Sequence, residues 1–145
     1  MQSGIRIEKI ELEVSTLQLK LSVGDGESQF CNSVYVDVSQ LDSFLNKLNL
    51  FKTQIFGGIL NFQLGEFGQE YARGAMSLRF HFREPSKIYI SIKSQGSFED
   101  FGTQKVANEA AFFLISEPVL LDNFIDDLKA LIANEKNDAA FETIN

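Results

Sequence analysis

Apolar and polar residues alternate along several short runs of the chain, at residues 5–23, 32–38, 60–64, 76–82, 88–92 and 111–115. A period of two predicts β-strands that bury one face, and such strands are typical of an antiparallel sheet. The alternation slips by one residue near Ser15 and Thr16, which predicts a bulge or bend there. Glu84-Pro85-Ser86 joins two of the runs and predicts a hairpin turn.

Two other segments show the helical spacing of three and four residues between apolar side chains. The first begins near Ser39, where Ser39-Gln40-Leu41-Asp42 resembles a capping box. Its apolar side chains are Leu41, Phe44, Leu45 and Leu48. The second runs from about Pro118, a residue that suits a first helical turn, to Asn134. Its apolar side chains are Leu121, Phe124, Ile125, Leu128, Leu131 and Ile132.

These elements predict a single α+β domain over residues 1–134. We expect a mostly antiparallel sheet of about six to seven strands, packed by two helices. Residues 135–145 are predicted to form a flexible C-terminal tail. With 145 residues, of which 44% are hydrophobic, the chain is long enough and apolar enough for one core.

The net charge of −7 is concentrated in the last third of the chain. Residues 1–95 carry ten acids and ten bases, whereas residues 96–145 carry ten acids and three bases. Affinity for nucleic acid comes mainly from basic residues that neutralise phosphates, so nucleic acid is not the expected partner. A protein with a basic surface is the expected partner, because complementary charge speeds association.

The sequence carries few signals of a cellular compartment. No run approaches the ~18 apolar residues of a membrane span, and the first residues lack the apolar run of a secretory signal. Cys31 is the only cysteine, which rules out an intramolecular disulfide, and we expect it to be a packing residue. We therefore expect a cytoplasmic protein with no membrane partner.

The sequence contains no recognisable catalytic or metal-binding motif. One histidine and one cysteine do not supply the ligands of a zinc site, and aspartates on a helix cannot wrap Ca²⁺ as a loop would. A Ser–His–acid triad would need His81 as its base, and no Gly-x-Ser-x-Gly motif accompanies it. We therefore expect no cofactor, no metal and no enzymatic activity.

The acidic last third is the first candidate for a binding surface. Glu99 and Asp100 lie between two phenylalanines, and Asp122 and Asp126 share one face of the predicted helix. Acids beside exposed aromatic rings are what a surface facing a basic protein would use. This candidate predicts a non-enzymatic protein-binding domain.

The alternative candidate is a polar sheet face that carries Arg79, His81 and Arg83 on one strand. Their spacing of two residues puts the three side chains on the same face, and Lys87 and Lys93 belong to the following strand. Such a face could bind an anionic small molecule, which would make the protein a ligand-binding protein or an enzyme. The competing interpretation is a solvated face whose cations pair with acids across the sheet.

The order of features over residues 11–133 resembles the WapI-like family of small bacterial proteins, of the wall-associated-protein immunity type. The resemblance lies in an N-terminal strand pair, in the C-terminal helix, and in Val36-Asp37-Val38-Ser39-Gln40-Leu41, Gly58-Ile59-Leu60-Asn61-Phe62 and Met76-Ser77-Leu78-Arg79-Phe80. It implies a cytoplasmic protein that neutralises a cognate toxin by binding it. Such proteins often mask a basic active site with acidic groups, and these framework features carry over no functional residue.

Overall fold

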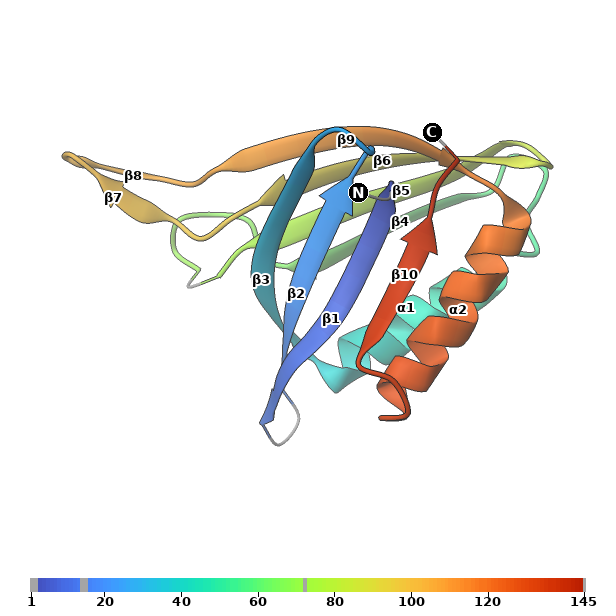
Figure 1. The fold of residues 1–145 in the computed structure, drawn as a ribbon, viewed down its shortest axis with the longest axis horizontal. Coiled ribbons are helices and arrows are strands. Elements are labelled where there is room, and N and C mark those ends of the chain that lie inside the picture. Colours follow the sequence, from blue (N-terminus) through green and yellow to red (C-terminus); the bar gives the residue numbers. More distant parts are fainter. Residues whose placement is uncertain (1–2, 14–15, 72, 145) are drawn as a thin grey trace.

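The computed structural model of the protein describes residues 3–13, 16–71 and 73–144, and in this part of the chain ten strands and two helices are found (Figure 1). Sheet A has the spatial order β10 (Asp138–Glu142), β1 (Gly4–Glu13), β2 (Thr16–Gly24) and β3 (Gln29–Asp37). Sheet B has the order β4 (Ile59–Gly65), β5 (Ala75–Glu84), β6 (Lys87–Gln95) and β9 (Glu109–Ser116). β7 (Glu99–Phe101) and β8 (Gln104–Val106) form a separate hairpin. The helices are α1 (Val38–Phe51) and α2 (Pro118–Ile132).

The predicted α+β class, with antiparallel strands and two helices, is confirmed, but the single sheet of six to seven strands is wrong. Within the described residues the ten strands divide among three sheets, and every pair of neighbouring strands is antiparallel. Alternation identifies strands one at a time, and it carries no information on which distant strands pair. The turn predicted at Glu84-Pro85-Ser86 does join β5 to β6.

The first alternating run forms two strands instead of one bent strand. β1 and β2 are antiparallel neighbours, with Glu13 opposite Thr16. The bend predicted near Ser15 lies outside the described residues. The structure places an irregularity of the register between Lys9 and Glu11.

The two helices begin and end at residues suited to those positions. Asp37 precedes α1, and its backbone N–H donates to the Gln40 side-chain oxygen at 2.9 Å, so the helix begins earlier than the predicted Ser39. α2 begins at Pro118, as predicted. It ends before Asn134, whose φ of 62° is left-handed, and the Glu135 N–H donates to the Ala130 carbonyl at 2.9 Å.

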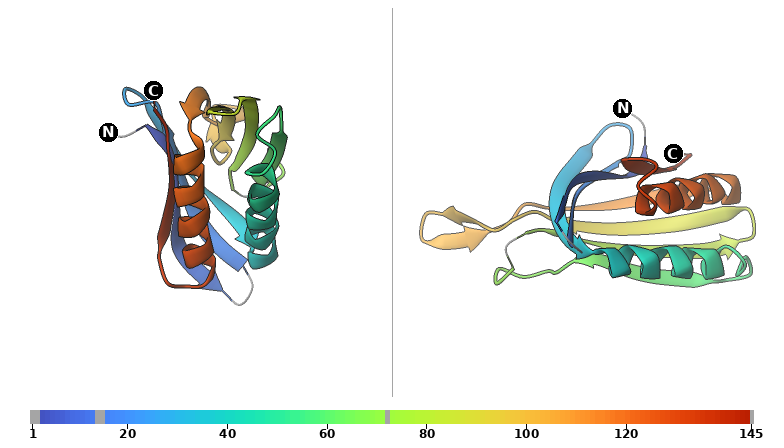
Figure 2. Two further views of the ribbon diagram at one scale, coloured as in Figure 1. Left: turned by 90° about the vertical axis from the view of Figure 1, so that its right-hand side faces the viewer. Right: turned by 90° about the horizontal axis from the view of Figure 1, so that it is seen from below.

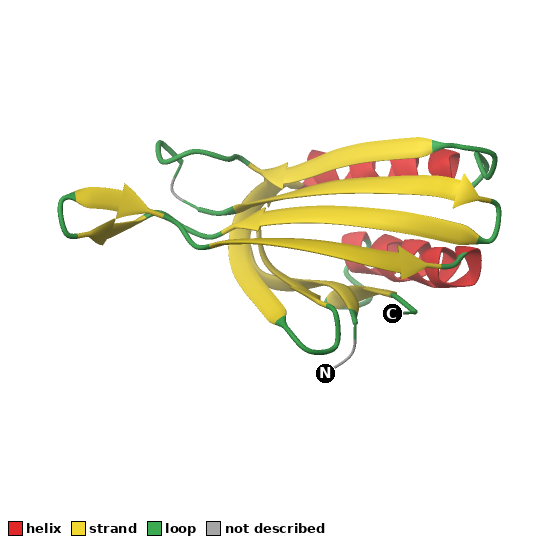
Figure 3. Ribbon diagram, turned by 90° about the horizontal axis from the view of Figure 1, so that it is seen from above, coloured by secondary structure: helices red, strands yellow, loops and turns green. Residues whose placement is uncertain are grey.

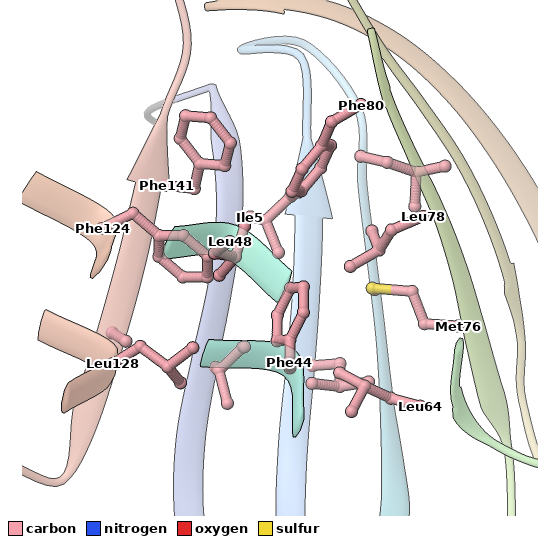
Figure 4. Packing of buried hydrophobic residues seen from close by; sticks show 14 of the residues in the cluster. Ile5, Phe44, Leu48, Leu64, Met76, Leu78, Phe80, Phe124, Leu128 and Phe141 are labelled. Carbon is pink, nitrogen blue, oxygen red and sulfur yellow. The ribbon is translucent and has the colours of Figure 1, made fainter. Parts of the chain in front are cut away.

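Both helices lie against the inner face of sheet B, and sheet A closes the same core from the side (Figures 2 and 3). Phenylalanine rings connect these elements (Figure 4). Phe44 of α1 stacks on Phe62 of β4, with ring centroids 4.5 Å apart. Phe141 of β10 contacts Phe80 of β5 at 5.4 Å and Phe124 of α2 at 5.2 Å. One hydrophobic core therefore holds both sheets and both helices together.

The flexible tail predicted for residues 135–145 is wrong for most of its length. Residues 138–142 form β10, which pairs with β1 so that Phe141 lies opposite Ile5. Phe141 has an exposed fraction of 0%. The Ser116 hydroxyl donates to the Glu142 carbonyl at 2.7 Å. The apolar run Ala139-Ala140-Phe141 is short and flanked by charges, which is why its pattern alone does not reveal a strand.

Candidate functional site

One face of sheet B lies opposite the core, and no other layer of the described structure covers it (Figure 3). We call it the outer face of sheet B. Its central residues are Ile59, Asn61, Gln63, Ser77, Arg79, His81, Arg83, Tyr89, Ser91, Lys93, Ala111, Phe113 and Ile115, and Lys87 and Glu109 continue the same alternation at its margins. They alternate with the buried side chains of the same four strands.

The register of the four strands arranges the centre of this face in three rows. In the order β4, β5, β6, β9 the rows are Ile59, His81, Tyr89, Ile115; then Asn61, Arg79, Ser91, Phe113; then Gln63, Ser77, Lys93, Ala111. None of these twelve positions holds a carboxylate. A cationic face therefore exists on a protein whose net charge is −7.

The structure places Arg79, His81 and Arg83 together on β5, as their spacing predicts. Arg79 is exposed, and its Nη1 lies 3.5 Å from Asn61 Oδ1. Arg83 lies over the Tyr89 ring, 4.9 Å from the centroid. His81 is half-buried between Ile59 and Tyr89 on the neighbouring strands.

The outer face is hollowed into an open depression of about 520 Å³. Arg79 and Lys93 supply its charge, Asn61, Ser77 and Ser91 its neutral polar groups, and Phe113 an aromatic ring that is 75% exposed. Glu109 lies at one end, where its side chain accepts a hydrogen bond of 3.0 Å from Gln95. Asn61 and Phe113 were not among the predicted site residues, since only the register shows that Asn61 lies beside Arg79 and that Phe113 lies in the same row, beyond Ser91.

The cations of this face differ from those of sheet A. On sheet A, Arg6 pairs with Glu8 at 3.0 Å and with Asp138 at 3.1 Å, and Lys20 lies 3.9 Å from Glu8. Arg79, Arg83 and Lys93 form no ion pair with any described residue. Of the cations on β5 and β6, Lys87 at the margin does pair, with Glu117 at 3.5 Å.

The four predicted acidic residues do not form one surface. Glu99 and Asp100 lie on β7, in the hairpin that projects beyond one end of sheet B (Figures 1 and 3). Asp122 and Asp126 lie on exposed positions of α2, toward the opposite end of the molecule. Asp100 is moreover bound by Lys105, with Nζ and Oδ1 3.0 Å apart.

Cys31 and His81, the only residues of their types, belong to different sheets. Cys31 is exposed on β3, so its prediction as a packing residue is wrong, and its Sγ lies 3.4 Å from the Ser22 hydroxyl. The described residues contain no cluster of three or more His, Cys, Asp or Glu side chains that could hold a metal ion. The chemistry that the outer face of sheet B offers is the binding of anionic groups by Arg79 and Lys93 beside apolar side chains.

No helix in the described ranges is long and apolar enough to cross a membrane. Comparisons of the chain with protein-family models, curated proteins and solved structures found no match.

Proposed function

We propose that this protein is a non-enzymatic binding domain whose outer face of sheet B holds a protein partner with an acidic surface. The observation that carries the proposal is the set of three cations, Arg79, Arg83 and Lys93, which have no ion-pair partner among the described residues. They share one open face with exposed Ile59 and Phe113. Arginine and aromatic side chains are enriched where proteins bind one another.

The shape of the face supports a protein partner over a small ligand. Sites for small molecules are clefts that bury most of the ligand surface. The depression around Arg79 and Lys93 is open, and it belongs to a face that runs across all four strands of sheet B. A second protein can cover such a face, and complementary charge then raises its association rate.

The immunity function implied by the family resemblance stays a prediction. It assigns the acidic surface to this protein and the basic surface to the toxin. Glu99 and Asp100 are far from Asp122 and Asp126 along the molecule (Figure 1), so the four acids do not form a joint mask. The cationic outer face supports the opposite polarity, with the acidic surface on the partner.

The proposal is tested by capture from a lysate with three immobilised baits. They are the unaltered protein, the variant Arg79→Glu, Lys93→Glu, and the control Lys52→Glu, Lys129→Glu, which changes the net charge equally at exposed positions elsewhere. We expect an acidic protein that the unaltered and control baits retain and the face variant does not. Retention should also weaken as salt is raised, because salt screens exposed charges.

The captured protein is then purified, and its association rate is measured with each bait protein. Reversal of both cations should slow association by about tenfold or more. Equal capture and equal rates for the face variant and the control would disprove the proposed function.

A further inference from the structure

Four residues at the centre of the outer face of sheet B form a square, which we call the cationic square. Ser77 and Arg79 are two positions apart on β5, and Ser91 and Lys93 are two positions apart on β6. Arg79 lies opposite Ser91, and Ser77 lies opposite Lys93. The two cations therefore occupy one diagonal of the square, and the two serines occupy the other. Such diagonal neighbours on one face of a sheet are about 7–8 Å apart.

Every corner of the cationic square carries a group that donates hydrogen bonds. Arg79 and Lys93 form no ion pair with a described residue. Their contacts are with neutral groups, since Arg79 Nη1 lies 3.5 Å from Asn61 Oδ1 and Lys93 Nζ lies 6.0 Å from the centroid of the Phe67 ring. Within the described residues, neither serine hydroxyl has a hydrogen-bond partner. An anion on the square would therefore meet donors and no opposing carboxylate.

The short serine side chains make the cationic square accessible from solvent. All four of its residues line the open depression of about 520 Å³. Ser77 and Ser91 are half-buried, whereas the longer Arg79 and Lys93 are exposed. A compact group can therefore descend between the two cations and reach the two hydroxyls.

An apolar surface on β9 borders the cationic square. Phe113 lies opposite Ser91, and Ala111 lies opposite Lys93. Both line the same depression, and the Phe113 ring is 75% exposed. Because Ala111 is small, a flat apolar group can lie over it beside the Phe113 ring, in the geometry that aromatic pairs prefer.

We infer that this depression binds a phosphotyrosine side chain of the acidic partner, with the phosphoryl group on the cationic square and the ring beside Phe113. A phosphoryl group carries a charge of about −1.5 to −2 at pH 7 and three acceptor oxygens. It matches two cations and two hydroxyls better than a carboxylate does, because a carboxylate has one charge and two oxygens. The apolar surface at Phe113 favours tyrosine over serine as the phosphorylated residue. This inference rests on the proposed function, because it names the group that the partner presents to the outer face of sheet B.

Fluorescence polarisation with labelled peptides tests the chemistry of the site. The peptides share one acidic sequence and differ at a central position, which is phosphotyrosine, tyrosine, phosphoserine or glutamate. The phosphotyrosyl peptide should bind about tenfold more tightly than each of the others, because it alone brings both the phosphoryl group and the ring. Equal binding of the tyrosyl or glutamyl peptide would overturn the role of the phosphoryl group, and equal binding of the phosphoseryl peptide would overturn the role of the ring. Failure of the phosphotyrosyl peptide to bind would overturn the whole inference.

Single variants of the protein test whether the phosphoryl group lies on the cationic square. Arg79→Gln and Lys93→Gln should each weaken binding of the phosphotyrosyl peptide by about tenfold. The control Lys129→Gln removes the same charge from an exposed position of α2 and should leave the affinity unchanged. Ser91→Val removes a hydroxyl and narrows the depression without a change of charge, so it should also weaken binding, and valine is a residue that strands favour. Unchanged binding by Ser91→Val, or equal losses for the phosphotyrosyl and glutamyl peptides, would show only a general effect of positive charge and would overturn the inference.

Treatment of the lysate with a tyrosine phosphatase separates this inference from the proposed function. The unaltered bait should capture its acidic partner from a lysate that holds the phosphatase together with its inhibitor vanadate, and should lose the partner when vanadate is left out. A partner that is still captured after the treatment, but not by the bait with Arg79→Glu and Lys93→Glu, would retain the proposed function and overturn the inference. Specific binding of the phosphotyrosyl peptide without capture of any protein would support the phosphotyrosine site and reject the acidic protein partner.

Discussion

Sheets A and B each consist of four antiparallel strands with one face toward a shared core and one away from it, yet their outer faces are built differently. On sheet A, Arg6 and Lys20 find carboxylates on the same strand or on a neighbouring one. Small residues such as Gly4, Gly24 and Ala140 line a hollow there. On sheet B, Lys87 at the margin pairs with Glu117, but Arg79, Arg83 and Lys93 have no ion-pair partner among the described residues. Aromatic rings lie beside two of them, Tyr89 beside Arg83 and Phe67 beside Lys93.

This difference identifies the feature on which the proposed binding surface depends. Cations on the polar side of a strand occur on both sheets. What distinguishes sheet B is that its neighbouring strands supply no acid in the rows of His81, Arg79 and Lys93. Sheet A pairs Arg6 and Lys20 with its own carboxylates, whereas Arg79, Arg83 and Lys93 of sheet B pair with no carboxylate of the described residues.

The comparison requires that the inner face of sheet A belong to the core and that the outer face of sheet B not belong to it. Phe141→Ala tests the first requirement. Removal of this fully buried ring should lower the free energy of unfolding by about 3–5 kcal/mol, because a cavity remains beside Phe80 and Phe124. Phe113→Ala on the outer face of sheet B should change it by less than about 0.5 kcal/mol. Urea denaturation measures both, and equal losses would contradict the assignment of the two rings.

The close approach of β1 to β10 in sheet A depends on the absence of a side chain at Gly4. Its φ is 143°, and a Cβ at this position would lie 2.3 Å from the Phe141 carbonyl oxygen. Gly4→Ala should therefore lower the free energy of unfolding by about 1–3 kcal/mol more than Gly26→Ala. Gly26 also has a positive φ, of 98°, but nothing lies within 4 Å of its added Cβ. Thermal and urea denaturation measure the free energy of unfolding of both variants. Equal values would show that sheet A tolerates a side chain at position 4.

Removal of single charges should affect the two sheets differently. Glu8→Gln removes a carboxylate that pairs with both Arg6 and Lys20, and we expect a loss of about 0.5–1 kcal/mol in the free energy of unfolding. Arg79→Gln removes a cation that forms no ion pair with the described residues, and the free energy of unfolding should remain unchanged within about 0.5 kcal/mol. A larger loss for Arg79 than for Glu8 in parallel urea titrations would reverse the comparison.

The smallest expected effect concerns pH and the turn between β2 and β3 of sheet A. Hydrogen bonds from the backbone N–H groups of Ser28 and Glu27 hold the pKa of the exposed Asp25 carboxyl below its usual range. Because this pKa is lower in the folded than in the unfolded chain, the ionised carboxylate stabilises the fold at neutral pH. That stabilisation is lost as the pH falls through the folded pKa. The unaltered protein and Asp25→Asn should thus differ slightly at pH 7 and converge in acid, and a difference that grows in acid would contradict the sign.

The sequence predicts long local elements well and distant pairings poorly. β5, β6 and the turn at Pro85 follow from uninterrupted alternation and turn chemistry, and α2 follows from its apolar spacing and Pro118. The pairing of β10 with β1 joins residues more than a hundred positions apart, and no local pattern encodes it. Three-residue strands such as β7 and β8 are too short to show a period.

The candidate site was predictable along one strand but not across the sheet. Arg79, His81 and Arg83 share a face because of their spacing alone. Whether acids of neighbouring strands pair with them depends on the register, and the register places Asn61, Ser91 and Tyr89 beside them. The separation of Glu99 from Asp122 likewise depends on where the chain places the hairpin and α2 (Figure 2).

The antiparallel pairing of β10 with β1 also affects how the chain can fold during its synthesis. A ribosome releases the N-terminal end first, so β1, sheet B and both helices emerge before residue 141 does. Until then the rings of Phe80 and Phe124 lack the Phe141 ring that contacts both. The nascent chain therefore keeps an apolar flank exposed until β10 emerges, and this flank is where a chaperone would act.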